Sequence, residues 1–89
     1  MIEILSPHNS RRDRIDKLNI YAQYGVAEYW IVDPETRQLE QYRLENGAYK
    51  LLLKSSSGEV ESLVVNGFKI PISAIFDNDL ALATLRKFL

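Results

Sequence analysis

The stretch IEILSPHNSRRDRIDKLNIYAQYGVAEYWIVD, residues 2–33, decides the fold. An apolar strand is expected over residues 1–5, and Pro7 ends it because a proline cannot donate a hydrogen bond to a β-ladder. Residues 27–33 are rich in β-branched and aromatic side chains, which predicts a buried strand. Since a helical pattern lies between the two, the stretch predicts a βαβ unit with parallel strands and a right-handed crossover.

The helix of this unit is predicted from about residue 11 to residue 24. Its apolar stripe is expected to consist of Ile15, Leu18, Tyr21 and Ala22, which recur at helical spacing. Ser10 and Asp13 have the spacing of a capping box, with Asp in place of the usual Glu. Gly25 stands where a left-handed residue is expected to end the helix.

The chain that follows predicts an antiparallel meander. Residues 38–44 form one strand, Asn46-Gly47 is a strong hairpin signal, and residues 48–54 form the returning strand. After a serine-rich loop, a further strand is expected over residues 59–65. These strands extend the parallel pair into a mixed sheet.

Two more elements are expected toward the C-terminus. Residues 68–76 predict a short extended piece that runs into a helical turn, with Ser73 as a candidate cap. Residues 78–89 predict an apolar terminal helix, which either closes the core or forms a dimer contact. The predicted fold class is therefore α/β with a mixed sheet, in a single domain over residues 1–89.

Composition excludes several classes of protein. A chain of 89 residues with 46% hydrophobic and 26% charged residues is typical of one globular domain. The net charge of −1 gives no overall attraction to nucleic acid or to anionic membranes. The absence of cysteine and the single histidine exclude disulfides and thiolate or multi-histidine metal sites. Because the sequence offers neither a membrane span nor a signal peptide, we expect a cytoplasmic protein with no membrane partner.

Glu3 and Lys17 are the first candidate site residues. A carboxylate on a strand can bind a divalent metal, and a nearby lysine can orient a water or stabilise the charge that develops on a phosphorane. The alternative is that Glu3 faces solvent and Lys17 extends from the flank of the helix. The residues alone favour this alternative, because no second metal-binding acid accompanies the pair.

A basic cluster of Arg11, Arg12 and Arg14 opens the predicted helix. Arginines at this end oppose the helix dipole, and a bound phosphate would reverse that cost. The cluster is a weak candidate for nucleic-acid binding, and the alternative is a solvated polar face. We interpret His8 as an exposed loop residue and Asp33 as a residue that initiates a turn.

Residues 3–51 resemble the C-terminal half of the Uma-type putative restriction endonucleases, a bacterial family with the PD-(D/E)XK nuclease fold. The shared pattern comprises Leu5-Ser6-Pro7, Asp13, Lys17-Leu18, Tyr21-Ala22, Gly25-Val26, Glu28-Tyr29-Trp30, Val32-Asp33-Pro34 and Tyr42-Arg43. The later segment 68–76 also fits, so the resemblance covers nearly the whole chain.

The resemblance implies roles for the pair. Glu3 falls on the position of a metal ligand, for Mg²⁺ or Mn²⁺, and Lys17 on that of a residue that orients water or phosphate. The implied reaction is the hydrolysis of a DNA phosphodiester. Family members carry an upstream segment with more core strands and another metal-binding aspartate. We therefore expect a truncated restriction-endonuclease-like core with little activity of its own.

The sequence leaves open three explanations for the missing upstream segment and one rival class of function. The chain is a natural remnant, a fragment of a longer protein, or a subunit whose partner supplies the missing half. The rival class is a non-catalytic interaction module that forms a homodimer through its first strand and its apolar terminal segment. Its motivation is that the first strand is apolar enough to lie inside a sheet and needs a covering element.

Overall fold

The computed structural model of the protein describes residues 1–5 and 11–77. A four-stranded sheet with the order β1-β2-β3-β4 and a two-stranded sheet of β5 and β6 form its framework. The elements are β1 (Ile2–Ile4), α1 (Arg11–Gln23), β2 (Glu28–Asp33), β3 (Gln38–Glu45), β4 (Ala48–Ser55), β5 (Glu59–Glu61), β6 (Lys69–Pro71) and α2 (Ile72–Ile75).

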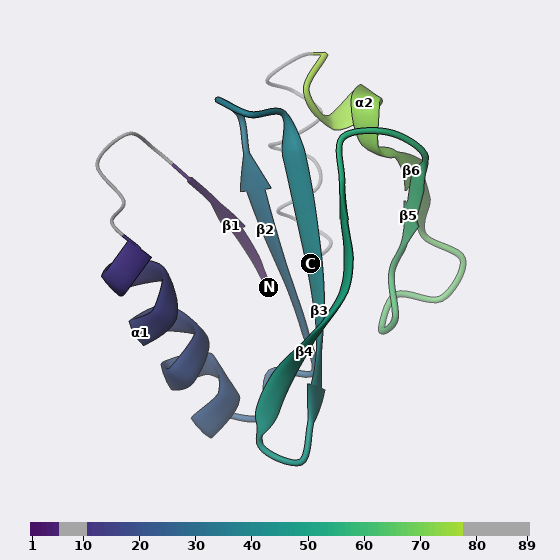
Figure 1. The fold of residues 1–89 in the computed structure, drawn as a ribbon. Coiled ribbons are helices and arrows are strands. Elements are labelled where there is room, and N and C mark those ends of the chain that lie inside the picture. Colours follow the sequence, from purple (N-terminus) through teal and green to yellow (C-terminus); the bar gives the residue numbers. More distant parts are fainter. Residues whose placement is uncertain (6–10, 78–89) are drawn as a thin grey trace.

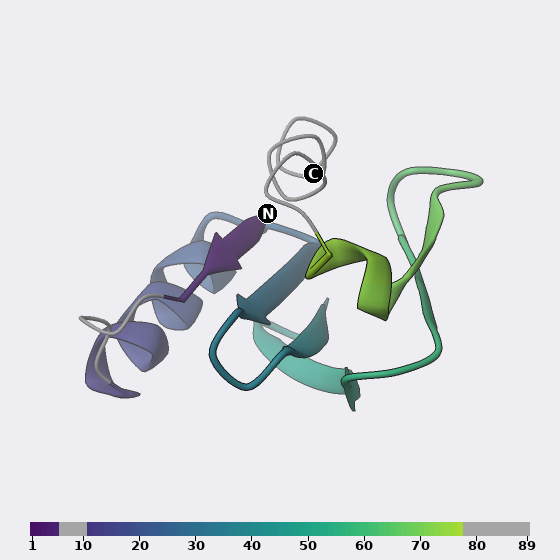
Figure 2. The ribbon, with the colours of Figure 1, turned by 90° about the horizontal axis from the view of Figure 1, so that it is seen from above.

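The four-stranded sheet is mixed, as the sequence predicts. β1 pairs in parallel with β2, whereas β2 with β3 and β3 with β4 are antiparallel. Helix α1 connects the two parallel strands and lies beside the sheet, while the small sheet and α2 lie on the opposite side (Figures 1 and 2). The mixed α/β class and the βαβ unit are therefore confirmed.

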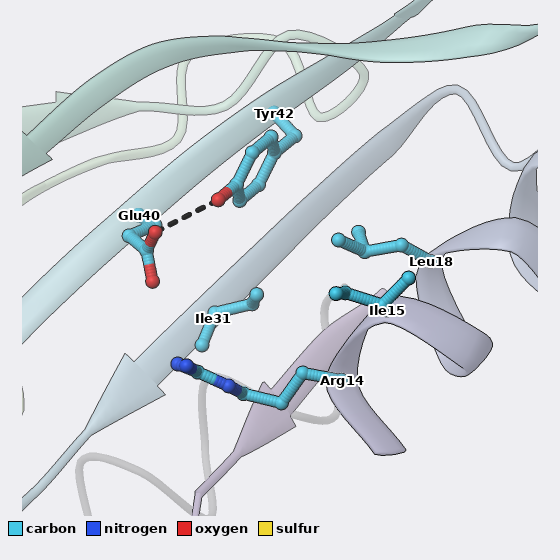
Figure 3. A pocket seen from close by; sticks show the side chains of 6 residues that line it. All are labelled: Arg14, Ile15, Leu18, Ile31, Glu40 and Tyr42. Atoms are coloured by element: carbon cyan, nitrogen blue, oxygen red, sulfur yellow. Dashed lines mark hydrogen bonds between the residues drawn. The ribbon is translucent and has the colours of Figure 1, made fainter. Parts of the chain in front are cut away.

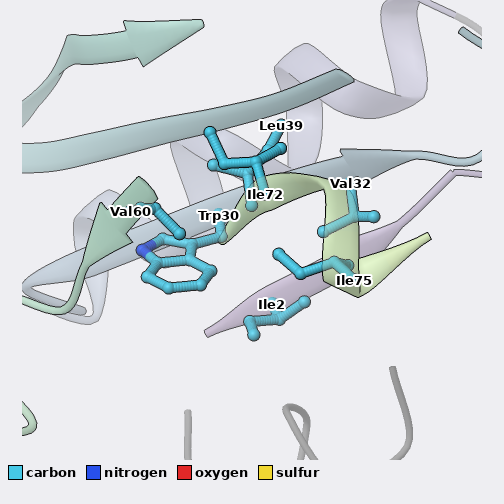
Figure 4. Packing of buried hydrophobic residues seen from close by; sticks show 7 residues of the cluster. All are labelled: Ile2, Trp30, Val32, Leu39, Val60, Ile72 and Ile75. Carbon is cyan, nitrogen blue, oxygen red and sulfur yellow. The ribbon is translucent and has the colours of Figure 1, made fainter. Parts of the chain in front are cut away.

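Strand β2 is buried on both of its faces, which explains its continuous apolar run. Trp30 and Val32 face the main core, and the other members of this core are Ile2, Leu39, Val60, Ile72 and Ile75 (Figure 4). Tyr29 and Ile31 alternate with them and face α1. The core thus ties the large sheet to β5, β6 and α2.

The predicted hairpin between β3 and β4 is confirmed. Asn46 has a φ of 51° and Gly47 a φ of 81°, as the two central residues of a type I′ turn require. Gly25, with a φ of 71°, follows α1 in the left-handed conformation expected at that place.

Helix α1 packs with a mixed stripe rather than an apolar one. Leu18, Tyr21 and Ala22 are half-buried, as predicted, and Lys17 is half-buried with them. Ile15, which the prediction placed in the buried stripe, is 49% exposed and lines a pocket between α1 and β3. The ion pair of Lys17 with β1 brings a polar residue into the contact.

Two further predictions are wrong. The strand expected over residues 59–65 ends at Glu61, because the Ser62 side chain turns inward to a buried carboxylate. Ser73 does not cap α2, since Pro71 is the N-cap residue and makes no side-chain capping bond. The predictions for Pro7, His8, Ser10 and the terminal helix 78–89 lie outside the described residues.

Candidate active site

Glu3 and Lys17 meet on the side of the sheet that faces α1. Glu3 is the central residue of β1 and is paired in register with Ile31 of β2. Lys17 Nζ lies 2.5 Å from Glu3 Oε1, and the Lys17 and Glu3 side chains are 39% and 19% exposed. The structure thus brings together the two residues that the sequence predicts as a pair, at a place that solvent reaches.

The charge state of Lys17 follows from this contact. The hydrogen bond that Lys17 donates to Glu3 raises the pKa of the ammonium, and this effect exceeds the opposing effect of desolvation. Lys17 is therefore a cation at neutral pH. In that state it can donate hydrogen bonds or stabilise negative charge, but it cannot accept a proton.

A pocket of about 260 Å³ lies next to the pair, between α1 and β3. It is lined by Arg14, Ile15, Leu18, Ile31, Glu40 and Tyr42 (Figure 3). Ile31 is paired in register with Glu3 on one side and with Glu40 on the other. The pocket and the Glu3–Lys17 pair therefore share one face of the sheet.

Two arginines of the predicted basic cluster, Arg12 and Arg14, have side chains that the structure describes. Arg14 is half-buried and lines the pocket, whereas Arg12 is exposed. The side chain of Arg11 and that of His8 lie outside the described part of the structure. Asp33 initiates the predicted turn, since its Oδ1 accepts hydrogen bonds from two backbone N–H groups of that turn.

Four tyrosines hold the same face of the sheet against α1. The rings of Tyr21 and Tyr29 lie 5.3 Å apart, those of Tyr29 and Tyr49 5.6 Å, and those of Tyr42 and Tyr49 6.5 Å. The Tyr49 hydroxyl donates to the Val26 carbonyl, which fixes the start of β2. Burial raises the pKa of Tyr29, so its phenol stays neutral. This cluster keeps the helix in place beside Glu3.

Glu28 is a buried carboxylate whose importance the sequence did not reveal. It is 2% exposed, and it accepts hydrogen bonds from Trp30 Nε1, Gln41 Nε2, Ser62 Oγ and the Leu63 backbone. Burial raises the pKa of Glu28, but these four bonds outweigh it and hold the pKa below its ordinary value. The sequence offered two signals, an acid at the start of an apolar strand and its place in the pattern shared with the Uma-type endonucleases, and neither indicates a buried hydrogen-bond network.

Glu28 lies on the opposite face of β2 from the Glu3–Lys17 pair. Its side chain bonds to Trp30 on the core side, whereas Glu3 is aligned with Ile31 on the helix side. Glu28 therefore joins the turn at residues 62–65 to β2 and β3, and it does not contribute a charge to the candidate active site.

The donor set around the pair fits a divalent metal in part. Mg²⁺ is commonly held by one or two carboxylates together with waters and substrate phosphates. Glu3 offers one carboxylate, and the described residues contain no group of three or more acidic or histidine side chains placed to hold a metal.

Neither of the described helices has the length and apolar composition needed to cross a membrane.

Comparison with models of known protein families gives a match. The model of the Uma2 family, described as "Putative restriction endonuclease", matches residues 1–73. None of the curated proteins compared with the chain matches it. The matched range includes the Glu3–Lys17 pair and every residue that lines the pocket.

Proposed function

Since the chain belongs to the Uma2 family of putative restriction endonucleases, we propose that it is part of a metal-dependent DNA endonuclease. The observation that carries this proposal is the 2.5 Å contact between Lys17 Nζ and Glu3 Oε1 at an accessible place on the sheet. The reaction is the hydrolysis of a phosphodiester, and the cofactor is Mg²⁺ or Mn²⁺.

Glu3 and Lys17 have distinct roles in this proposal. Glu3 would hold the metal through its carboxylate, and the metal would supply Lewis-acid stabilisation of the phosphoryl oxygens. Lys17 is a cation, so it orients the attacking water or a phosphate oxygen by donating hydrogen bonds, and its charge opposes the negative charge that develops.

The described residues supply one carboxylate to this site, the lower end of the one or two that hold Mg²⁺ in proteins. We therefore propose that residues 1–89 form one domain that corresponds to the C-terminal half of a complete nuclease. A second acid then comes from a further segment or from another chain. On this proposal the 89 residues alone have little or no activity.

A second candidate function is a non-catalytic interaction module, in the form of a homodimer. The observation that favours it is the position of β1, which pairs with β2 alone and forms an edge of the sheet within the described residues. Such an edge offers unpaired backbone groups to another strand. A monomeric mass by light scattering at micromolar concentration would argue against this function.

A plasmid-cleavage assay in Mg²⁺ and in Mn²⁺ tests the leading proposal. The chain is compared with the variants Glu3→Gln and Lys17→Met. The exposed Lys69–Glu59 pair, with an N–O distance of 3.9 Å, provides the matched controls Glu59→Gln and Lys69→Met. Little or no cleavage is expected from the chain alone. Cleavage lost in both site variants would support the assigned roles but contradict the expected inactivity of the chain alone, and cleavage retained in both would overturn the assigned roles.

A further inference from the structure

The pocket beside the pair has the form of a slot between α1 and β3. Ile15 and Leu18 of the helix form one wall, Glu40 and Tyr42 of β3 form the other, and Ile31 of β2 lies between them (Figure 3). Its volume of about 260 Å³ is below the roughly 300–1,000 Å³ of pockets that hold drug-sized ligands. The slot therefore suits a single flat ring system.

The charged groups of the slot are the guanidinium of Arg14 and the carboxylate of Glu40. Arg14 reaches in from α1, and no carboxylate of the described residues lies within ion-pair distance of its guanidinium. Glu40 Oε1 accepts a hydrogen bond from the Tyr42 hydroxyl at 2.7 Å. A carboxylate can accept about four hydrogen bonds, so Glu40 retains capacity for a ligand.

This combination discriminates between parts of a nucleic acid. A phosphate placed in the slot would meet the Glu40 carboxylate, which repels it. A nucleobase has no charge and can use both groups, because it carries acceptors and donors on its edges. The ring of Tyr42 and the aliphatic side chains opposite it are the surfaces on which extruded or single-stranded bases stack in proteins.

Among the four bases, guanine matches the two groups best. An arginine can donate two parallel bonds to O6 and N7 of guanine. The neighbouring Watson–Crick edge of guanine presents N1–H and N2–H₂, two adjacent donors that one carboxylate can accept. Adenine presents one donor group and cannot satisfy the carboxylate twice, and the pyrimidines lack the N7 acceptor.

We infer that the slot binds one unpaired guanine base of the DNA strand, adjacent to the phosphodiester at the Glu3–Lys17 pair. The placement rests on the proposed function, because it takes that pair as the site of reaction. Ile31, which separates Arg14 from Glu40 in the slot, is paired in register with Glu3, so the base site and the pair are neighbours on the sheet.

The test uses four trinucleotides, d(TGT), d(TAT), d(TCT) and d(TTT), titrated into the ¹⁵N-labelled chain without divalent metal and followed by NMR. We expect d(TGT) to bind at least about fivefold more tightly than the others. This ratio of affinities corresponds to about 1 kcal/mol, the lower end of the discrimination that one bidentate base contact provides. Tyr42→Leu should weaken all four at least about fivefold through lost stacking. Glu40→Gln and Arg14→Gln should each reduce the guanine preference, because each removes one of the two contacts to that base, and the double variant should abolish it.

Controls and contrary outcomes separate this inference from the proposed function. Arg43→Gln and Glu45→Gln change an exposed ion pair of the same strand and should leave the preference intact. Equal affinity for the four trinucleotides, or a guanine preference that is unchanged in the double variant of Glu40→Gln and Arg14→Gln, would overturn the inference. A Glu3→Gln variant should keep the preference. If metal binding at Glu3 fails while the preference stands, the slot remains a base site and the nuclease assignment falls.

Discussion

Lys17 Nζ donates a hydrogen bond of 2.5 Å to Glu3 Oε1, although the two residues are 14 positions apart and lie on different elements. The parallel pairing of β1 with β2 forces the chain to cross over, and α1 is that crossover. The helix must then pass over the face of the sheet that carries Glu3. The contact is thus a consequence of the βαβ topology.

The Glu3–Lys17 pair should contribute little to stability. Both side chains are partly exposed, and such pairs are worth about 0–1 kcal/mol. A double-mutant cycle of Glu3→Gln and Lys17→Met, measured by urea unfolding, should give a coupling energy in that range. The Glu59–Lys69 pair serves as the control cycle. A much larger coupling energy would indicate that the main role of the pair is to stabilise the fold.

The Glu28 carboxylate should be required for stability. It accepts four hydrogen bonds in the interior, and Glu28→Gln replaces one acceptor by a donor that faces other donors. We expect a loss of about 1–3 kcal/mol in the free energy of unfolding. The exposed Glu59→Gln is the matched control and should change stability by less than about 0.5 kcal/mol.

The contribution of Glu28 should depend on pH in a defined direction. Its pKa is lowered in the folded state, so the stabilisation is fully present above the ordinary value of 4.5 and is lost as the pH falls below it, through the folded pKa. The stability difference between the chain and Glu28→Gln should be constant from pH 5 to pH 8 and shrink in acid. A difference that grows on acidification would contradict the assigned shift.

The hairpin turn should tolerate substitution poorly at Gly47. Its φ is 81° and nothing lies within 4 Å of the position of an added Cβ, so the cost of Gly47→Ala comes from the backbone alone. We expect a loss of about 1–2 kcal/mol in the free energy of unfolding. Asn46→Gly, at the neighbouring position with positive φ, is the control and should be close to neutral. Equal losses in both variants would argue against the type I′ turn.

The contact of α2 with the sheet should be a main source of stability. Ile75 is fully buried in the core cluster with Trp30 and Val32. Ile75→Ala should cost about 2–5 kcal/mol through lost burial and a residual cavity. Ile20→Ala, at a position 49% exposed on α1, is the control and should change stability by about 0.5 kcal/mol or less. Similar midpoints of urea unfolding for the two variants would contradict this packing.

Local signals predicted the framework of the fold. The β-branched run that became β2, the Asn46-Gly47 turn and Gly25 after α1 each determine a backbone conformation with few neighbours, so they can be recognised in the sequence. The meeting of Glu3 and Lys17 was one of two alternatives that these signals left open, and their chemical roles remain predictions.

Features that depend on distant residues escaped prediction. Ser62 ends β5 early because its hydroxyl donates to Glu28, 34 positions away. The exposure of Ile15 was not predicted, because its hydrophobicity and helical spacing alone placed it in the buried stripe, whereas Lys17 of the same helix pairs with an acid on β1. A single sequence does not show which polar groups will find a buried partner.

Binding of Mn²⁺ tests the central claim, that Glu3 is a metal ligand beside Lys17, most directly. In ¹⁵N-labelled protein, substoichiometric Mn²⁺ should broaden the amide signals of Ile2, Ile4 and Ile31 first, because they surround Glu3 in the sheet. Glu3→Gln should abolish this broadening, and Glu59→Gln should leave it unchanged. Broadening that persists in Glu3→Gln, or that is centred on other residues, would contradict the account.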